Sequence, residues 1–333
     1  MKSKPVKILI AFGIIAVALL GIAHSMFAAV GRSGKVMVMI PKGSSASQVA
    51  EILAEKGIVR SAVGFKLLAR VTGQSCCLKP GAYELDPSAG PRAALDKIAR
   101  GDVSARWITI PEGYTLRQIG ERIEAEKSGS ADRFVELARN EGRSFDTSFT
   151  HPGDNLEGYL YPDTYLVPIG ASEESIIKMM LDAFTSKVAD PLADEISRSG
   201  MSLHDCITLA SLVEREARIP KDRRLISAVI HNRLRIGMPL QIDATVLYAL
   251  GYHKERVLYR DYEIDSPYNT YRNPGLPPGP IASPGLESIK AALHPADVRY
   301  LYYVARPDGS HIFTHTFDEH KQAQQRARRE RAN

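Results

Sequence analysis

The spacing of hydrophobic residues changes several times along the chain, and each change marks a predicted element. The run KVMVMI, residues 35–40, alternates like a β-strand. The next two runs, which end at residues 59 and 73, have hydrophobic residues at helical spacing, and GAYEL, residues 81–85, is typical of a short strand. We therefore predict a β-α-α-β module over residues 36–104.

This element order matches the small LysM-like modules that bind glycan chains, although many other small α+β units share it. A second stretch repeats the first: IPKGSSASQVAEIL from Ile40 aligns without gaps with IPEGYTLRQIGERI from Ile110. In both copies a strand ends at Pro, Gly turns the chain, and Ser45 or Thr115 can cap the next helix. The repeat indicates either duplicated glycan-handling modules or a recurring strand-turn-helix unit, and it assigns residues 105–154 to a second, linking α+β subdomain.

From residue 155 the pattern becomes mostly helical, which predicts a larger domain over residues 155–327. SEESIIKMMLDAFTSKV is typical of an amphipathic helix, and we expect another from Leu203 to Arg218. Pro220 fits the first turn of a third helix, which Gly237 would end.

The run from Pro274 to Gly285 contains too many prolines and glycines for regular structure. A short helix should follow, with Ser283 as its cap and Pro284 at its first position. YLYYVA, RPDGS and HIFTHTF then predict a β-hairpin, followed by a charged helix and a basic tail at residues 328–333. The expected fold class is thus α+β.

Residues 8–30 (ILIAFGIIAVALLGIAHSMFAAV) have no charged side chain when His24 is neutral. As a helix they would span about 34 Å, enough to cross the hydrocarbon core of a membrane. More basic residues lie in residues 1–7 than just after the segment, which predicts a cytoplasmic N-terminus and a single-pass transmembrane helix. The alternative is a cleaved signal peptide with a cleavage site at FAA, but the apolar run is longer than a usual signal core.

Composition, charge and cysteine content limit the number of folded units, the possible partners and the possible site chemistry. The chain of 333 residues, with 24% charged and 44% hydrophobic residues, is long enough for two or three folded units. The net charge of +5 is spread along the chain without a recognition motif, so we expect no nucleic-acid partner. Cys76 and Cys77 are adjacent and Cys206 is distant, a pattern that supports neither a disulfide framework nor a zinc or redox site.

Two glutamates, Glu214 and Glu216, stand out in the apolar helical run ITLASLVEREARIP. Residues two apart on a helix point in nearly opposite directions, so the two side chains have different surroundings. Glu214 precedes Arg218 by four residues, which predicts an ion pair. Glu216 faces apolar neighbours instead, which would raise its pKa and suit it to act as a general acid. The competing interpretation is that Glu216 reaches solvent at the helix end.

Five long motifs stand out in the chain: LASLVERE, VIHNRLRIGMPLQIDATVLYALG, YNTYRNPGLPPGPIASPGLESIKAALHP, YLYYVARPDGSHIFTHTFDEH and EGYLYPDTY. Together they resemble the YceG-like family of endolytic murein transglycosylases. The resemblance covers almost the whole chain and implies a lytic-transglycosylase-like catalytic domain over residues 155–327, with Glu216 as the catalytic residue.

The resemblance also implies the reaction. Members cleave the β-1,4 bond between N-acetylmuramic acid and N-acetylglucosamine within peptidoglycan strands and leave 1,6-anhydro ends, with one glutamate acting first as acid and then as base. No cofactor or metal is implied. The expected location is the bacterial cytoplasmic (inner) membrane with an extracytoplasmic catalytic domain, where the enzyme would terminate strand growth with peptidoglycan synthases as candidate partners. The alternatives are a non-catalytic glycan-binding scaffold for these synthases and a hydrolase that uses water.

Asn232, Gln241 and Asp243 match family positions near the site, and the stretch SPYNTY adds an amphipathic cluster of polar and aromatic residues. They could bind acetamido groups or sugar rings, or they could serve as caps and hold the Pro/Gly loop. This set comprises Asn232, Gln241, Asp243, Tyr268, Asn269, Thr270 and Tyr271.

Two further features have competing interpretations. Glu157 can contact glycan, although an ion pair or a role in a turn is the preferred interpretation. His311 and His315 alternate onto one strand face with His320 nearby, which suggests a metal site only superficially, and hairpin packing is the preferred interpretation.

Overall fold

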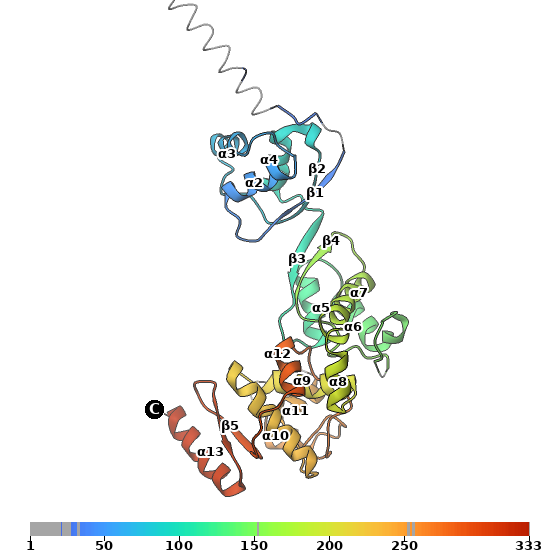
Figure 1. Cartoon of the computed structure of the whole chain (residues 1–333), viewed down its shortest axis with the longest axis vertical. Coiled ribbons are helices and arrows are strands. Elements are labelled where there is room, and N and C mark those ends of the chain that lie inside the picture. Colours follow the sequence, from blue (N-terminus) through green and yellow to red (C-terminus); the bar gives the residue numbers. More distant parts are fainter. Residues whose placement is uncertain are drawn as a thin grey trace, which may run out of the picture. The chain divides into compact units, whose positions relative to one another are not determined.

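The computed structural model describes residues 21, 28–31, 34–151, 153–251, 254 and 257–332, and Figure 1 traces the chain through them. These residues divide into two compact units. The N-terminal unit extends to Trp107 and includes Leu166–Ile169, and the C-terminal unit comprises Ile108–Tyr165 and the chain from Gly170. Strands β3 (Ala105–Thr109) and β4 (Thr164–Pro168) carry the chain between the units. The finer domain boundaries expected from the sequence stay predictions.

The N-terminal unit has the predicted β-α-α-β order. Strands β1 and β2 pair in antiparallel fashion, with Val36 opposite Leu85 and Ile40 opposite Gly81, and the sheet order is β1-β2-β3-β4. The helices pack around a core that includes Phe65 and Tyr83. The elements are β1 (Val36–Ile40), α2 (Ala46–Glu55), α3 (Ala62–Val71), β2 (Gly81–Leu85), a 3-10 turn (Pro87–Ala89) and α4 (Gly90–Arg100). The specific likeness to LysM modules stays a prediction.

The sequence repeat has the same local structure in both copies. Ser45 is the N-cap of α2 and exchanges hydrogen bonds with Gln48, and Thr115 caps α5 (Leu116–Ala125) in the same way. The turn before each helix contains a glycine in the left-handed region, which a residue with a side chain rarely adopts. The predicted strand-turn-helix unit with its capping residues is therefore confirmed in both copies.

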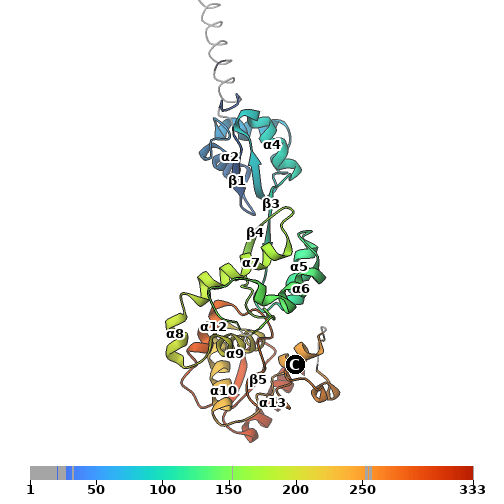
Figure 2. The same cartoon turned by 90° about the vertical axis from the view of Figure 1, so that its right-hand side faces the viewer.

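The C-terminal unit is mostly helical and ends in a hairpin with a covering helix (Figures 1 and 2). Helix α9 packs against α10, α11 and α12, and α13 packs on both hairpin strands. After α5 the elements are α6 (Ala131–Asn140), a 3-10 turn (Gly142–Ser144), α7 (Glu173–Phe184), a π-turn (Thr185–Ala189), α8 (Ala193–Ser199), α9 (Leu203–Glu216), a 3-10 turn (Pro220–Asp222), α10 (Arg223–Arg235), α11 (Asp243–Leu250), a 3-10 turn (Tyr259–Glu263), α12 (Leu286–Leu293), β5 (Tyr302–Ala305), β6 (His311–Thr314) and α13 (Phe317–Ala332).

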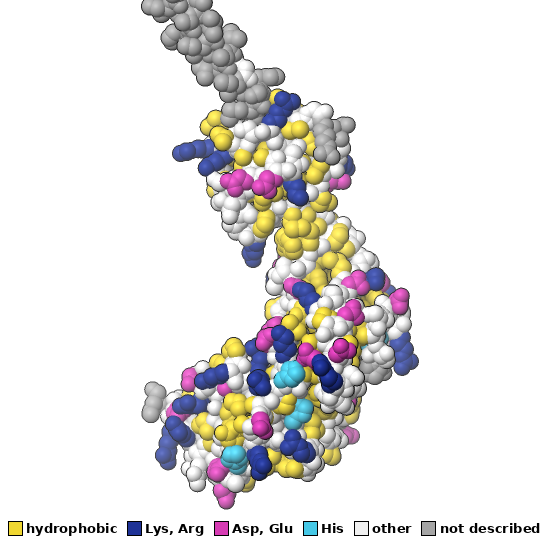
Figure 3. Space-filling model, viewed as in Figure 1, with side chains coloured by type: hydrophobic (Ala, Val, Ile, Leu, Met, Phe, Trp, Pro, Cys, Tyr) yellow, Lys and Arg dark blue, Asp and Glu magenta, His cyan; other side chains and the backbone are white. Residues whose placement is uncertain are grey.

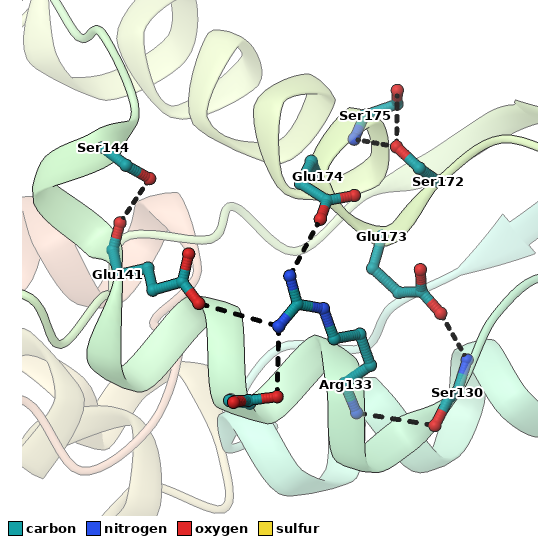
Figure 4. A network of polar contacts seen from close by, with 9 residues as sticks. Ser130, Arg133, Glu141, Ser144, Ser172, Glu173, Glu174 and Ser175 are labelled. Atoms are coloured by element: carbon teal, nitrogen blue, oxygen red, sulfur yellow. Dashed lines mark hydrogen bonds and ion pairs between the residues drawn. The ribbon is translucent and has the colours of Figure 1, made fainter.

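Polar contacts join α6 to the start of α7 (Figure 4). The Arg133 guanidinium on α6 forms ion pairs with Glu174 on α7 and with Glu141. The Glu173 carboxylate accepts a hydrogen bond of 2.7 Å from the backbone N–H of Ser130, the N-cap of α6. Because exposed ion pairs contribute little to stability, these contacts orient α6 relative to α7 more than they stabilise the fold.

Most predicted helix boundaries in this unit are confirmed, and two are wrong. Pro220 opens the turn into α10, and Gly237 follows directly after the C-cap. Helix α9, however, ends at Glu216 rather than Arg218. Helix α12 begins at Leu286, and Ser283 does not cap it.

The predicted transmembrane segment, residues 8–30, lies outside the described residues except for residue 21 and residues 28–30. Within the part of the chain that the structure describes, no helix has the length and hydropathy needed to span a membrane.

Charged side chains are distributed over the surface of the C-terminal unit. On the face in Figure 3, Lys and Arg side chains alternate with Asp and Glu side chains. This distribution agrees with the spread of charge seen in the sequence.

Candidate active site

Glu216 is the last residue of α9, a helix held firmly by its neighbours. All residues of α9 from Cys206 to Val213 are buried. At Ala217 the backbone leaves the helix for an extended conformation with φ −75° and ψ 112°. Glu216 therefore lies at the end of a buried helix, where the chain changes direction. The Glu216 side chain is half-buried.

The surroundings of Glu216 favour its protonated form. Burial raises the pKa of its carboxyl to about 7, and the negative charge of Asp243 acts in the same direction. A hydrogen bond of 3.1 Å from the Tyr303 hydroxyl to Oε2, together with Arg215 and Arg218, partly opposes this rise. The raised pKa inferred from the sequence is thus confirmed in direction, with burial as its main cause.

Tyr303 comes from β5, 87 residues further along the chain. Burial and the adjacent Glu216 carboxylate hold the pKa of its hydroxyl well above its usual range. It therefore remains a proton donor at neutral pH and fixes one oxygen of Glu216.

Asp243 brings a second carboxylate to this site. It is the first residue of α11, and its Oδ1 accepts hydrogen bonds of 3.2 Å from Tyr262 and 2.5 Å from Tyr271. The two tyrosine rings pack with their centroids 4.4 Å apart. Glu216 and Asp243 thus form an acidic pair next to two half-buried tyrosine rings, whose apolar faces and hydroxyls are suited to a sugar ring.

A buried, hydrogen-bonded Asp–His pair lies behind Tyr303. Both the backbone N–H and Nδ1 of His311 contact Oδ2 of Asp222, at 2.8 and 2.9 Å. The His311 ring meets the Tyr303 ring edge-to-face at 5.5 Å between centroids. This packing restricts Tyr303 to the orientation in which its hydroxyl reaches Glu216.

The predicted ion pair between Glu214 and Arg218 is wrong. Because α9 ends at Glu216, Arg218 is not one helical turn beyond Glu214, and no ion pair among the described residues joins them. Instead, Oε2 of Glu214 accepts hydrogen bonds from the Gly285 N–H at 3.2 Å and the Ser288 hydroxyl at 2.7 Å. Glu214 therefore binds the start of α12, whose N-cap residue is Gly285 rather than the expected Ser283.

Three of the predicted binding residues hold the fold together. Asn232 donates to the carbonyl oxygens of residues 298 and 300, both at 2.9 Å, before β5. Asn269 is fully buried and donates to the carbonyls of residues 262 and 264, and the Thr270 hydroxyl accepts from the backbone N–H of residue 242. These contacts match the interpretation that they hold the loop, and a substrate-binding role stays a prediction for them.

Gln241, Tyr268 and Tyr271 have more open positions. Gln241 is exposed and adopts a left-handed conformation with φ +53° just before α11. Tyr271 contacts Asp243, as described above, while Tyr268 packs on Tyr248 with ring centroids 4.9 Å apart. The YNTY motif is therefore divided between the Glu216 site and a region around Tyr248.

Glu157 is more deeply buried than Glu216, with only 1% of it exposed. Its carboxylate accepts hydrogen bonds from the Leu116 N–H at 3.1 Å and the Tyr248 hydroxyl at 3.3 Å. Burial raises its pKa to about 7. Since Leu116 begins α5, Glu157 serves the start of that helix, and no ion pair involves it among the described residues.

The three histidines make separate contacts. His315 Nδ1 lies 3.2 Å from the carbonyl oxygen of Arg299, and the His320 ring stacks on Tyr302. Among the residues that the structure describes, no three His, Cys, Asp or Glu side chains are grouped to hold a metal ion.

Residues 38–326 match the model of the YceG-like family. The chain belongs to the YceG-like family. Its sequence is 39% identical over 310 residues to an endolytic murein transglycosylase of Bacillus subtilis, covering 87% of this chain and 84% of that protein.

Two further relatives agree with this assignment. An endolytic murein transglycosylase of Streptococcus pneumoniae is 32% identical over 81% of this chain, although the match covers only 54% of that protein. The crystal structure of a YceG-like protein from Listeria monocytogenes has a TM-score of 0.62 and 37% identity, covering 86% of this chain and 98% of that one.

Sequence reasoning missed two parts of this YceG-like site. Tyr303 was visible only as one of several aromatic residues in YLYYVA, and the Asp222–His311 pair joins positions 89 residues apart. Strand alternation separates Tyr302 from Tyr303, but it does not say which one faces Glu216.

Proposed function

We propose that this protein cleaves peptidoglycan glycan strands internally, at the β-1,4 bond between N-acetylmuramic acid and N-acetylglucosamine. The observation that carries the proposal is Glu216: its carboxyl is half-buried, has its pKa raised to about 7, and accepts a hydrogen bond from Tyr303. Membership of the YceG-like family and relatives named endolytic murein transglycosylases support the substrate class.

In the first step, protonated Glu216 donates its proton to the glycosidic oxygen as the C1–O bond breaks. Positive charge develops at C1 of the muramic acid, and the Asp243 carboxylate stabilises it electrostatically. The Tyr303 hydroxyl stabilises the newly formed Glu216 carboxylate through its hydrogen bond to Oε2.

In the second step, the Glu216 carboxylate accepts the proton of the muramic acid C6 hydroxyl, whose oxygen bonds to C1. The product is a 1,6-anhydro end, no water is consumed, and Glu216 is again protonated. Because the nucleophile belongs to the substrate, it is already held close to C1. One carboxyl can therefore serve both steps.

We further propose that residues 8–30 anchor the protein in the cytoplasmic membrane with its catalytic unit outside the cytoplasm. In this position it would cut nascent strands and end their growth, and peptidoglycan synthases are candidate partners. The length and hydropathy of the segment in the sequence support this part of the proposal.

The proximity of Asp243 to Glu216 supports one alternative function, that of a hydrolase. With Asp243 beside Glu216, a water molecule could be activated as the nucleophile, giving hydrolysis and reducing ends. A non-catalytic scaffold is the other alternative, and it predicts no cleavage at all.

The experiment is a digest of purified glycan strands followed by mass spectrometry of the ends. Wild-type protein should give 1,6-anhydro ends, and Glu216→Gln, which keeps shape but has no proton to donate, should give none. Ends heavier by one water would favour the hydrolase. Equal product release by both proteins would overturn the role of Glu216.

A further inference from the structure

A large pocket in the C-terminal unit lies outside the Glu216 site. Its volume is about 840 Å³, a size typical of ligand sites. Tyr248 and Tyr268 form an aromatic wall, and four cationic side chains also line the pocket: Arg117, Arg139, Arg215 and Lys254. We call it the side pocket.

The side pocket begins next to the two acidic residues of the active site. Arg215 lines it and directly precedes Glu216, and Ala244 lines it and directly follows Asp243. Neighbouring residues are only about 3.8 Å apart at their Cα atoms, but on a helix they point about 100° apart. The pocket therefore adjoins the cleavage position without coinciding with it, and a strand bound at Glu216 can place a substituent there.

The charge of the lining favours an anion. Glu121 is the acidic residue that lines the side pocket, against four bases. Glu157 lies beneath, bonded to Tyr248, and its raised pKa of about 7 reduces the negative charge that it contributes. The pocket thus offers a net positive surface beside an aromatic wall.

Two of the bases already have acidic partners. Arg117 pairs with Asp132 at 2.7 Å, and Lys254 pairs with the Asp261 carboxylate. Arg139 and Arg215 form no ion pair among the described residues, and Arg215 donates one hydrogen bond to the Gly113 carbonyl. Their remaining guanidinium donors are suited to a carboxylate, which they can bind in bidentate fashion.

We propose that the side pocket binds carboxylates of the peptide stem that the muramic acid carries. This inference rests on the proposed function, because it assumes a glycan strand at Glu216. The stem leaves the lactyl group of the sugar, next to the bond that is cut, and it carries free carboxylates. The pocket therefore makes the enzyme select strands that retain their stems.

The test compares two substrates: glycan strands with intact stems and the same strands after an amidase has removed them. Wild-type protein should cleave the stem-bearing strands with a higher kcat/KM. In Arg139→Gln the ratio of the two kcat/KM values should fall about tenfold, through KM rather than kcat. The matched control is Arg143→Gln, which removes the same charge from an exposed site outside the pocket.

The possible outcomes separate the two claims. If wild-type protein releases anhydro ends from neither substrate, the proposed function fails and this inference fails with it. If it cleaves both, but Arg139→Gln keeps the wild-type ratio or Arg143→Gln changes the ratio equally, only the side-pocket inference is overturned. An equal loss on both substrates also overturns it, because it would indicate binding of the strand itself. Circular dichroism of both variants controls for folding.

Discussion

Glu216 and Glu157 are two glutamates in the same unit whose pKa values are both raised to about 7, with desolvation of the carboxyl group as the main cause in each case. Each also accepts a hydrogen bond from a tyrosine, Tyr303 or Tyr248. Their positions differ: Glu157 is 1% exposed and bonded to the first N–H of α5, whereas Glu216 is half-buried at the end of α9. A raised pKa alone does not identify a catalytic acid, and access to substrate separates the two.

The largest expected effect distinguishes the two glutamates by activity. Glu216→Gln should lower the rate of anhydro-end formation at least a thousandfold, about 4 kcal/mol in the barrier, because the proton donor is lost. Glu157→Gln should stay within about tenfold of wild type, because its role is to support α5. Rates from the strand digest measure both, and comparable losses would contradict the distinction.

The next effect concerns stability and pH. A glutamate with a raised folded pKa keeps its proton in the folded state at a pH where the unfolded chain has released it. Stability should therefore fall as pH rises from about 4.5 to about 7, by up to about 3 kcal/mol for fully buried Glu157.

Glu157→Gln removes this titration and keeps an acceptor for the Leu116 N–H. Its free energy of unfolding in urea should consequently depend less on pH than that of wild type over this range. Parallel pH curves for the two proteins would show that Glu157 does not titrate in this way.

The third effect tests Tyr303. Activity needs protonated Glu216, so the rate should fall as pH rises through about 7. Tyr303→Phe removes a hydrogen bond to the carboxylate, which should move this alkaline limb to higher pH while lowering the maximal rate about tenfold.

Tyr302→Phe is the matched control for Tyr303→Phe, because Tyr302 lies on the same strand and its ring packs against His320 and Arg233. Its alkaline limb should coincide with that of wild type. If the alkaline limb of the Tyr303→Phe pH–rate profile coincided with that of wild type, the Tyr303 hydroxyl would have no influence on the pKa of Glu216.

The smallest effect concerns Tyr248. Tyr248→Phe removes the hydroxyl that donates to Glu157 at 3.3 Å, and it should cost about 1 kcal/mol of stability at pH 8. Urea unfolding measures this loss. A shift of the alkaline limb of activity in this variant would contradict the assignment of Glu157 to structure alone.

Local features of the fold could be predicted because they depend on neighbours in sequence. Ser45 and Thr115 cap their helices as expected, and the hairpin that contains β5 and β6 also formed as expected. Turn glycines, capping side chains and hydrophobic spacing act over a few residues, and the sequence displays them directly.

The predicted cap of α12 and the predicted Glu214–Arg218 ion pair were wrong because contacts with distant segments replaced the expected local contacts. Ser283 has the right residue type for a cap, but α12 begins after Gly285, and the Glu214 carboxylate from α9 binds this start of the helix. The helix containing Glu214 also ended two residues early, which removed the expected pairing with Arg218. A propensity for capping or pairing is worth about 1 kcal/mol or less, so tertiary contacts override it easily.

The sequence by itself determined the type of the elements, the repeat and the family resemblance, and it predicted Glu216 rather than Glu214 as the catalytic residue. Only the tertiary structure decided the surroundings of Glu216: the Tyr303 hydroxyl, the Asp243 carboxylate and the packing of His311 behind Tyr303. The physical reason is that burial and electrostatics depend on distances in space. These groups come from segments that are far apart along the chain, and folding alone brings them together.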